Sequence, residues 1–254
     1  MSDFHKLLYS IDRNIARITL NRPDKRNALD DEMIGELRSA LHASSEDASV
    51  HGVLLTGAGK DFCSGADLAG LQRIADSGVM ENIADARRLA DLFLEMRRHP
   101  RPIVAAVRGR ALAGGCGIAT AADIVLASES AQFGYPETKI GFVPAMVMAI
   151  LRRSVPEKRA FELLISGEII PARTALEIGL INRAFDEGAF ENEVESYVAQ
   201  LATRSVSALA LTKALLYQTD AISFEAALNA GVQTNALARM TEDCRRGIDQ
   251  FLKK

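Results

Sequence analysis

Segments typical of strands alternate with segments typical of helices along the first half of this 254-residue chain. Residues 15–20 alternate apolar and polar side chains, a pattern that predicts a half-buried strand. Residues 50–56 and 103–107 are short apolar runs, and their length and branched side chains favour buried strands. Apolar residues recur at helical spacing over 30–41 and 81–98. This order of segments predicts an α/β core.

Helical patterns dominate the second half of the chain. The elements predicted first are a small-residue helix over 114–122, a strand over 123–127, and helices over 145–153, 157–166 and 172–178. No strand pattern follows Glu187, and further helices are predicted over 191–203, 207–217, 224–237 and 242–253. We therefore divide the chain into a core over 1–190 and a helical C-terminal region over 191–254 that packs on it.

Composition argues against several kinds of partner. The chain has 30 Lys and Arg against 33 Asp and Glu, a formal net charge of −3, whereas nucleic-acid binding depends on surplus cations. No apolar segment approaches the roughly 20 residues that span a bilayer, so we expect no membrane partner. The N-terminus shows no basic region followed by an apolar one, so we expect no secretory signal. Cys63, Cys116 and Cys244 lie far apart, which argues against disulfides or a zinc site and favours the cytoplasm.

The sequence lacks several familiar catalytic and ligand-binding motifs. Residues 57–61 lack the spacing, and the Ser or Thr, of a phosphate-binding loop. No Gly-x-Gly-x-x-Gly follows the first strand, and Ser64 follows Phe62 and Cys63, which excludes a Gly-x-Ser-x-Gly nucleophile elbow. The four histidines are scattered and have no metal-ligand partner at helical spacing. The sequence therefore predicts neither a metal centre nor a catalytic triad.

Three segments share a different feature, a strand end that runs into a turn of glycine or other small residues. They span 62–68, 109–117 and 132–138. Glycine permits backbone conformations that expose N–H groups, and it lets a ligand approach the main chain. Two such N–H groups from different turns would form an oxyanion hole, and a Gly-Gly pair opening a helix would add the helix dipole. The alternative interpretation is that small residues merely allow close packing of helices on strands.

Taken together and in this order, the segments resemble the crotonase (enoyl-CoA hydratase/isomerase) superfamily. The resemblance covers nearly the whole chain, through 20–29, 62–68, 103–109, 123–125, 133–137, 166–167, 175–182, 241–243, Gly247 and Phe251. It implies an α/β spiral of repeated ββα units, with a helical C-terminal region that covers the pocket and builds a homotrimer or a dimer of trimers. It also implies an acyl-CoA thioester substrate, no cofactor besides the coenzyme A of that substrate, and a role in fatty-acid β-oxidation.

The resemblance places an oxyanion hole at the backbone N–H groups of Ala66 and Gly114. These donors would hold the thioester oxygen, on which negative charge develops when a proton moves at the neighbouring carbon. Two stretches would contact coenzyme A, and the cations of the first suit its phosphates. The binding residues so implied are Lys25, Arg26, Asn27, Ala28 and Leu29, then Ala66, Asp67 and Leu68, together with Gly114. For Asp67 we favour a cap on the following helix over contact with substrate.

Glu137 matches the position of the family's acid/base glutamate. Its apolar neighbours are expected to desolvate the carboxyl and raise its pKa, and these are Phe133, Tyr135, Ile140 and Phe142. The family's two-glutamate hydratases carry their second carboxylate where this chain has Gly117. We interpret the adjacent Cys116 as a small buried thiol and not as a nucleophile.

The missing carboxylate leaves two reactions open. Hydration of a 2-enoyl-CoA is favoured by its frequency in the family. It requires a water oriented at C3 and a proton delivered to C2, two tasks that two carboxylates would naturally share. Shifting a double bond from C3 to C2 needs one base, and so it suits Glu137 alone. Asp67, Glu81 or Asp85 could supply the second carboxylate of a hydratase. A homologue that binds acyl-CoA but catalyses little is the alternative from a different functional class.

Overall fold

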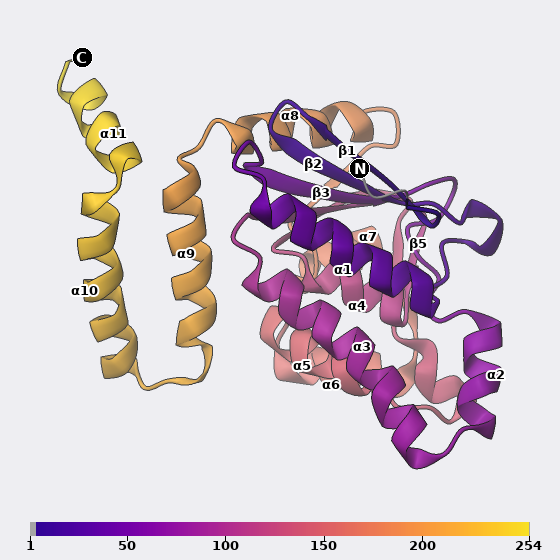
Figure 1. Ribbon diagram of the computed structural model, residues 1–254. Coiled ribbons are helices and arrows are strands. Elements are labelled where there is room, and N and C mark those ends of the chain that lie inside the picture. Colours follow the sequence, from indigo (N-terminus) through magenta and orange to yellow (C-terminus); the bar gives the residue numbers. More distant parts are fainter. Residues whose placement is uncertain (1–3, 254) are drawn as a thin grey trace.

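The computed structural model describes residues 4–253, apart from the side chains of Leu68 and Ile74. A six-stranded sheet lies at its centre, in the order β1-β2-β3-β4-β6-β9 (Figure 1). Its strands are β1 (Leu7–Asp12), β2 (Ile15–Leu20), β3 (Gly52–Gly57), β4 (Ile103–Val107), β6 (Ile124–Ser128) and β9 (Arg183–Phe185). β1 pairs antiparallel with β2, and each later pair is parallel. Parallel pairs need crossover connections, which the helices supply.

Both faces of this sheet are covered, as continuous apolar strands require. Side chains alternate between the faces of a strand, so Ile103 joins the larger apolar cluster and Val104 the smaller one. Helices α1 (Asp31–Glu46) and α3 (Val79–Arg98) cover the first face and pack on each other. Helix α8 (Phe190–Ala202) covers the second face (Figure 1).

A three-stranded sheet completes the core, in the order β5-β7-β8. Its strands are β5 (Arg110–Leu112), β7 (Gln132–Gly134) and β8 (Ile169–Pro171). β5 and β7 run parallel, so the turns after them lie at the same edge. These turns lead into helix α4 (Gly114–Ala121) and the 3₁₀ helix η2 (Pro136–Ile140). The remaining core helices are η1 (Pro23–Lys25), α2 (Leu68–Asp76), α5 (Ala145–Ser154), α6 (Glu157–Ser166) and α7 (Ala172–Glu177).

The last helices form an arm that projects from the core (Figure 1). We call residues 206–252 the C-terminal arm, and it contains α9 (Val206–Gln218), η3 (Thr219–Ala221), α10 (Phe224–Met240) and α11 (Glu242–Leu252). The buried ammonium of Lys213 fixes α9 to the core, because its Nζ lies 2.6 Å from Oδ2 of Asp123. No described residue of α10 or α11 is buried, and several large apolar side chains of α10 are exposed, among them Phe224, Leu228 and Val232.

The α/β class and the helical C-terminal region are confirmed. The strands at 15–20 and 103–107 and the helix at 157–166 have their predicted bounds, and the other helices predicted after residue 80 agree within three residues. No strand follows Phe185 among the described residues, as predicted. Sequence patterns do not predict β1, α2 or the three-residue strands. The predicted division into a core over 1–190 and a C-terminal region over 191–254 stays a prediction. Helix α8 packs on the sheet, and the arm begins only at Val206.

Candidate active site

Backbone pairing brings together four segments that lie far apart in the sequence. Isolated bridges join Leu29 to Ala66 and Cys63 to Ala111. The parallel pair β5–β7 then places the second and third predicted turns side by side. The loop before α1 and the three small-residue turns therefore meet at one site.

The two predicted oxyanion donors have free N–H groups. Within the described part of the chain, no protein acceptor bonds the backbone nitrogen of Ala66 or of Gly114. The bridge to Leu29 uses the neighbours of Ala66, because Gly65 accepts from Leu29 and Asp67 donates to it, each over 2.8 Å. In such a parallel bridge the N–H of Ala66 itself points to the opposite side.

An unusual backbone conformation presents the N–H of Gly114. Ala113 has φ 49° and ψ −126°, a region that costs a residue with a side chain about 1–3 kcal/mol. It precedes α4, whose first N–H groups have no acceptor within the helix. Gly65, at φ 96°, lies against this turn, since a Cβ there would be 2.8 Å from the Cβ of Ala113 and 3.7 Å from the nitrogen of Gly114. The turns carrying the two donors are therefore in contact.

The carboxyl group of Glu137 is half-buried in η2. Its Oε2 is buried and has no hydrogen-bond partner among the residues described. Burial raises the pKa of Glu137, because the charged form is poorly solvated there. The segment that carries this carboxyl lies beside the start of α4, because the N–H of Ala113 donates to the carbonyl of Gly134 over 2.8 Å. Burial and, to a smaller extent, the charge of Glu137 raise the pKa of the Cys116 thiol to about 11.

Only two of the four predicted apolar neighbours of Glu137 are inside the protein. Phe133 and Tyr135 are buried, whereas Ile140 and Phe142 are 70% and 46% exposed. Phe133 and Tyr135 are therefore inside the protein as a desolvating pair would be, whereas for Ile140 and Phe142 the expectation stays a prediction. The Tyr135 hydroxyl is hydrogen-bonded over 2.8 Å to Thr120 and does not bond Glu137.

The cysteines of the site are not activated. Burial raises the pKa of Cys63 to about 12 and that of Cys116 to about 11. Both thiols are therefore protonated at neutral pH, which fits the interpretation of Cys116 as a packing residue.

The three carboxylates considered as substitutes for a second glutamate are engaged elsewhere. Asp67 accepts from Arg22, and Glu81 accepts the N–H of Gly78 at the start of α3 over 2.9 Å. Asp85 pairs with Arg88 over 2.8 Å. Gly117 itself is buried inside α4.

The predicted coenzyme A segments line a pocket of about 410 Å³. Its lining residues are Asp24, Lys25, Arg26, Ala28, Ser64, Ala66 and Asp67. Lys25 and Arg26 are exposed and form no ion pair within residues 4–253. Two unpaired cations beside a pocket suit the phosphates of a ligand.

Asn27 and Leu29 lie inside the protein. Asn27 is fully buried, and its Nδ2 donates to the carbonyls of Ala58 and Asp61 over 2.9 and 2.7 Å. Its side chain therefore shapes the loop instead of lying free for a ligand. Leu29 is also buried, and its Cδ1 lies 3.4 Å from where a Cβ of Gly114 would be.

Arg22 links the loop before α1 to the start of α2, a role that sequence patterns do not indicate. Its guanidinium donates to the carbonyl of Ala28 over 2.6 Å and to Oδ2 of Asp67 over 2.8 Å. Asp67 also accepts the N–H of Ala69 over 2.9 Å, which confirms the predicted helix cap. These two contacts lower the pKa of Asp67. The side chain of Leu68, predicted to bind coenzyme A, lies outside the described part of the structure.

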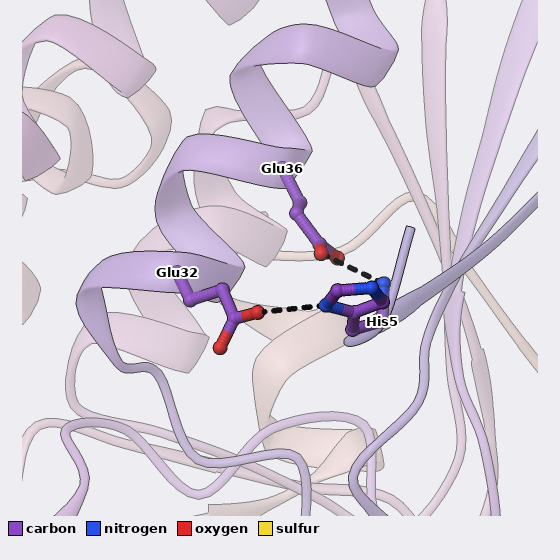
Figure 2. A group of neighbouring side chains, drawn as sticks. All are labelled: His5, Glu32 and Glu36. Carbon is purple, nitrogen blue, oxygen red and sulfur yellow. Dashed lines mark hydrogen bonds and ion pairs between the residues drawn. The ribbon is translucent and has the colours of Figure 1, made fainter. Parts of the chain in front are cut away.

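A cluster of His5, Glu32 and Glu36 lies outside this site (Figure 2). Their candidate ligand atoms are within 4.8 Å of one another. The histidine and the two glutamates are distant in sequence, so spacing along the chain does not reveal the cluster. Glu36 accepts the backbone N–H groups of His5 and Lys6, and Glu32 contacts the His5 ring and the Lys6 ammonium. The cluster thus attaches the N-terminal segment to α1.

Comparison with known proteins agrees with the fold. The family model for enoyl-CoA hydratase/isomerase matches residues 10–254. A Thermus thermophilus protein named "Putative enoyl-CoA hydratase" is 41% identical over 95% of both chains. The 2,3-dehydroadipyl-CoA hydratase of Escherichia coli is 33% identical over 98% of this chain and 96% of its own. The crystal structure of an enoyl-CoA hydratase from Mycobacterium smegmatis superposes with a TM-score of 0.94, at 32% identity over 98% and 96% of the two chains.

The fold is therefore that of the crotonase enzymes. The chain belongs to the enoyl-CoA hydratase/isomerase family, and it is an enzyme of the hydratase or isomerase type. No described helix has both the length and the apolar character needed to cross a membrane.

Proposed function

We propose that the enzyme hydrates 2-enoyl-CoA thioesters, with Glu137 as acid and base. The observation that carries the proposal is the buried Oε2 of Glu137, which has no partner among the described residues and belongs to the segment hydrogen-bonded to the turn that exposes the N–H of Gly114. A carboxyl group held in this way is suited to proton transfer, because desolvation brings its pKa toward neutral pH. The names of the relatives support hydration as the leading reaction.

The proposed reaction divides its work between the main chain and one side chain. The N–H groups of Ala66 and Gly114 hold the thioester oxygen and stabilise the negative charge that it acquires. Water gives its hydroxyl to C3 and a proton to Glu137. Glu137 then delivers a proton to C2, so that the product is a 3-hydroxyacyl-CoA and the carboxylate is restored.

Coenzyme A is proposed to bind in the pocket that Lys25, Arg26 and Ala28 line. The two cations would face its phosphates, and the pantetheine arm would pass Ala66 toward the oxyanion donors. The reaction needs no other cofactor, because the thioester supplies the activation. This chemistry suits fatty-acid β-oxidation in the cytoplasm.

Isomerisation of a 3-enoyl-CoA to a 2-enoyl-CoA is the second candidate. The observation that favours it is Gly117, which leaves the site without the second carboxylate of a two-glutamate hydratase. In this reaction Glu137 takes a proton from C2 and returns it to C4. The same donors would hold the dienolate oxygen.

The test is the ultraviolet absorbance of the conjugated enoyl thioester with two substrates. Loss of absorbance with crotonyl-CoA reports hydration, and a gain with a 3-enoyl-CoA reports isomerisation. Glu137→Gln should lower turnover at least about 100-fold and leave acyl-CoA binding largely intact. Glu129→Gln, a matched change at an exposed glutamate, should leave turnover unchanged. Unchanged turnover in Glu137→Gln would refute the role of this residue.

We also propose that the C-terminal arm assembles the enzyme as a homotrimer or a dimer of trimers. The support is its exposed apolar surface, which includes Phe224, Leu228 and Val232. A groove of about 490 Å³ between α9 and α10 adds a concave surface.

A further inference from the structure

Two buried hydroxyl groups beside the candidate active site take part in no step of the proposed reaction. The Tyr135 hydroxyl lies 2.8 Å from Oγ1 of Thr120, and both side chains are buried. Thr120 donates its hydroxyl proton to the carbonyl of Cys116, also over 2.8 Å. Tyr135 is therefore the donor in the first bond, because a hydroxyl group has only one proton to give. The result is a continuous chain of hydrogen bonds from Tyr135 through Thr120 to the main chain of α4.

These hydrogen bonds join the two elements that carry the proposed catalytic groups. Thr120 belongs to α4, which begins at the oxyanion donor Gly114. Tyr135 stands two residues before Glu137, at the point where the chain enters η2. The bond between Tyr135 and Thr120 therefore links the segment that carries the acid/base carboxyl to the helix that carries the main-chain donor.

Sheet pairing ends just before Tyr135. Strand β7 stops at Gly134, whose carbonyl accepts the N–H of Ala113 over 2.8 Å. Tyr135 follows directly, with φ −124° and ψ 73°, and its side chain makes the next link to α4. One main-chain bond and one side-chain bond thus attach the chain to the start and the body of α4 before it reaches Glu137.

Apolar packing alone does not explain a tyrosine at position 135. Phenylalanine would supply nearly the same apolar surface, and burying a hydroxyl group costs free energy unless the group is hydrogen-bonded. A hydrogen bond has a preferred distance and direction, whereas the hydrophobic effect is non-directional. Burial raises the pKa of Tyr135 well above its ordinary value, so the hydroxyl keeps the proton that it donates. The bond is therefore suited to fixing the position of the segment.

We infer that Tyr135 is a positioning residue whose hydroxyl, through Thr120, holds Glu137 in place relative to the N–H of Gly114. The inference deepens the proposed function and rests on it. Proton transfer requires the carboxyl to lie within hydrogen-bond reach of the reacting carbon, and a displacement of about 1 Å can cost a factor of about 100 in rate. Loss of the hydroxyl should slow the chemical step and leave coenzyme A binding unchanged, because other segments line the proposed coenzyme A pocket.

Tyr135→Phe tests the inference, because it removes the hydroxyl and keeps the ring. Thr120 can still donate to Cys116, so the variant should unfold at nearly the wild-type temperature. With whichever of the two enoyl-CoA substrates the enzyme converts, kcat should fall at least about fivefold and KM should stay within about twofold of wild type. Tyr9→Phe, at a half-buried tyrosine of β1, is the matched control and should keep the wild-type kcat. A wild-type kcat in Tyr135→Phe, or a loss confined to KM, would overturn the inference.

A mutant cycle separates positioning from a general structural effect. In a Glu137→Gln background there is no carboxyl to position, so Tyr135→Phe should change turnover by less than about twofold. Residues that act through one another show such non-additive effects, whereas independent effects multiply. The same fold-loss from Tyr135→Phe in both backgrounds would show that the hydroxyl does not act through Glu137.

Thr120 offers a second pair of variants, which decides if Tyr135→Phe does not fold. Thr120→Ser keeps the hydroxyl that accepts from Tyr135, and its kcat should stay within about twofold of wild type. Thr120→Val keeps the shape and removes the acceptor, so its kcat should fall at least about fivefold at a temperature where both variants are folded. Equal kcat values for the two variants would overturn the inference.

Failure of this inference is distinguishable from failure of the proposed function. Full turnover by Glu137→Gln would remove the catalytic role of that carboxyl. Low turnover by Glu137→Gln together with a wild-type kcat in Tyr135→Phe would leave the catalytic role intact and remove only the positioning role of Tyr135.

Discussion

Glu137 is a carboxyl whose surroundings disfavour its charge. Burial raises its pKa above the ordinary value, and its Oε2 has no partner among the described residues. A base must be deprotonated to act, so kcat/KM should fall on the acid side through this raised pKa. Initial rates measured from about pH 4 to pH 9 report it. An acid limb at or below the roughly 4.3 of an exposed glutamate would contradict the prediction.

The same burial has a consequence for stability. Between the pKa of the unfolded chain and the higher pKa of the folded one, the folded state binds the proton more tightly. The contribution of Glu137 to stability is therefore present at low pH and is lost as pH rises through the folded pKa. Glu137→Gln should unfold at a higher temperature than wild type near pH 8, and at a similar temperature near pH 4.5. Glu129→Gln should show no such pH-dependent difference, and equal midpoints for Glu137→Gln and wild type at both pH values would refute the prediction.

Gly114 offers a direct test of the main-chain donor. Gly114→Pro removes the N–H, and proline is tolerated at the first position of a helix such as α4. We expect kcat to fall about 10²–10³-fold in a protein that still folds. Gly114→Ala is the control, because it keeps the N–H and its Cβ would lie an acceptable 3.4 Å from Leu29. Full activity of the proline variant would refute the donor.

At the scale of elements, sequence patterns predict the helices and strands whose own residues show a hydrophobic period. They miss the short strands that form only because they pair with other strands. The helix at 157–166 follows from its own periodicity. Strands β5 and β7 have three residues each, too few to show a period, and they exist because they pair with each other. The contact of Val147 with Gly117 joins two helices 30 residues apart in the chain. In the sequence, the only indication of this contact is that residue 117 is a glycine and has no side chain.

The loop before α1 depends on a buried amide. Asn27 is held by Ala58 and Asp61 and has φ 54°. Asn27→Ala should destabilise the protein by roughly 2–4 kcal/mol, since it leaves buried groups unpaired and disfavours a positive φ. Urea unfolding measures the loss. Asn27→Gly keeps the backbone freedom and isolates the hydrogen bonds, so stability equal to wild type in Asn27→Gly would show that these bonds contribute little.

At the scale of the molecule, the sequence predicts the helices of the C-terminal region but not their isolation from the core. One described link is buried, where Lys213 meets Asp123 and the Tyr217 hydroxyl donates to the same carboxylate. The sequence pattern does not indicate this link, because a single lysine in a helix is normally interpreted as a solvent-exposed residue. A buried polar contact thus joins the arm to the core, while large apolar side chains of α10 are exposed.

Exposed apolar side chains on α10 make assembly the expected outcome. Val232 is 69% exposed in the single chain, so Val232→Asp should leave the fold intact while placing a charge in the proposed interface. Light scattering at micromolar concentration should give wild type a mass at least three times the 27.5 kDa of one chain, and the variant a smaller mass. Leu8→Asp, on the exposed face of β1, should keep the wild-type mass. A monomeric wild type would contradict assembly, and an unchanged mass for Val232→Asp would place the interface elsewhere than on the arm.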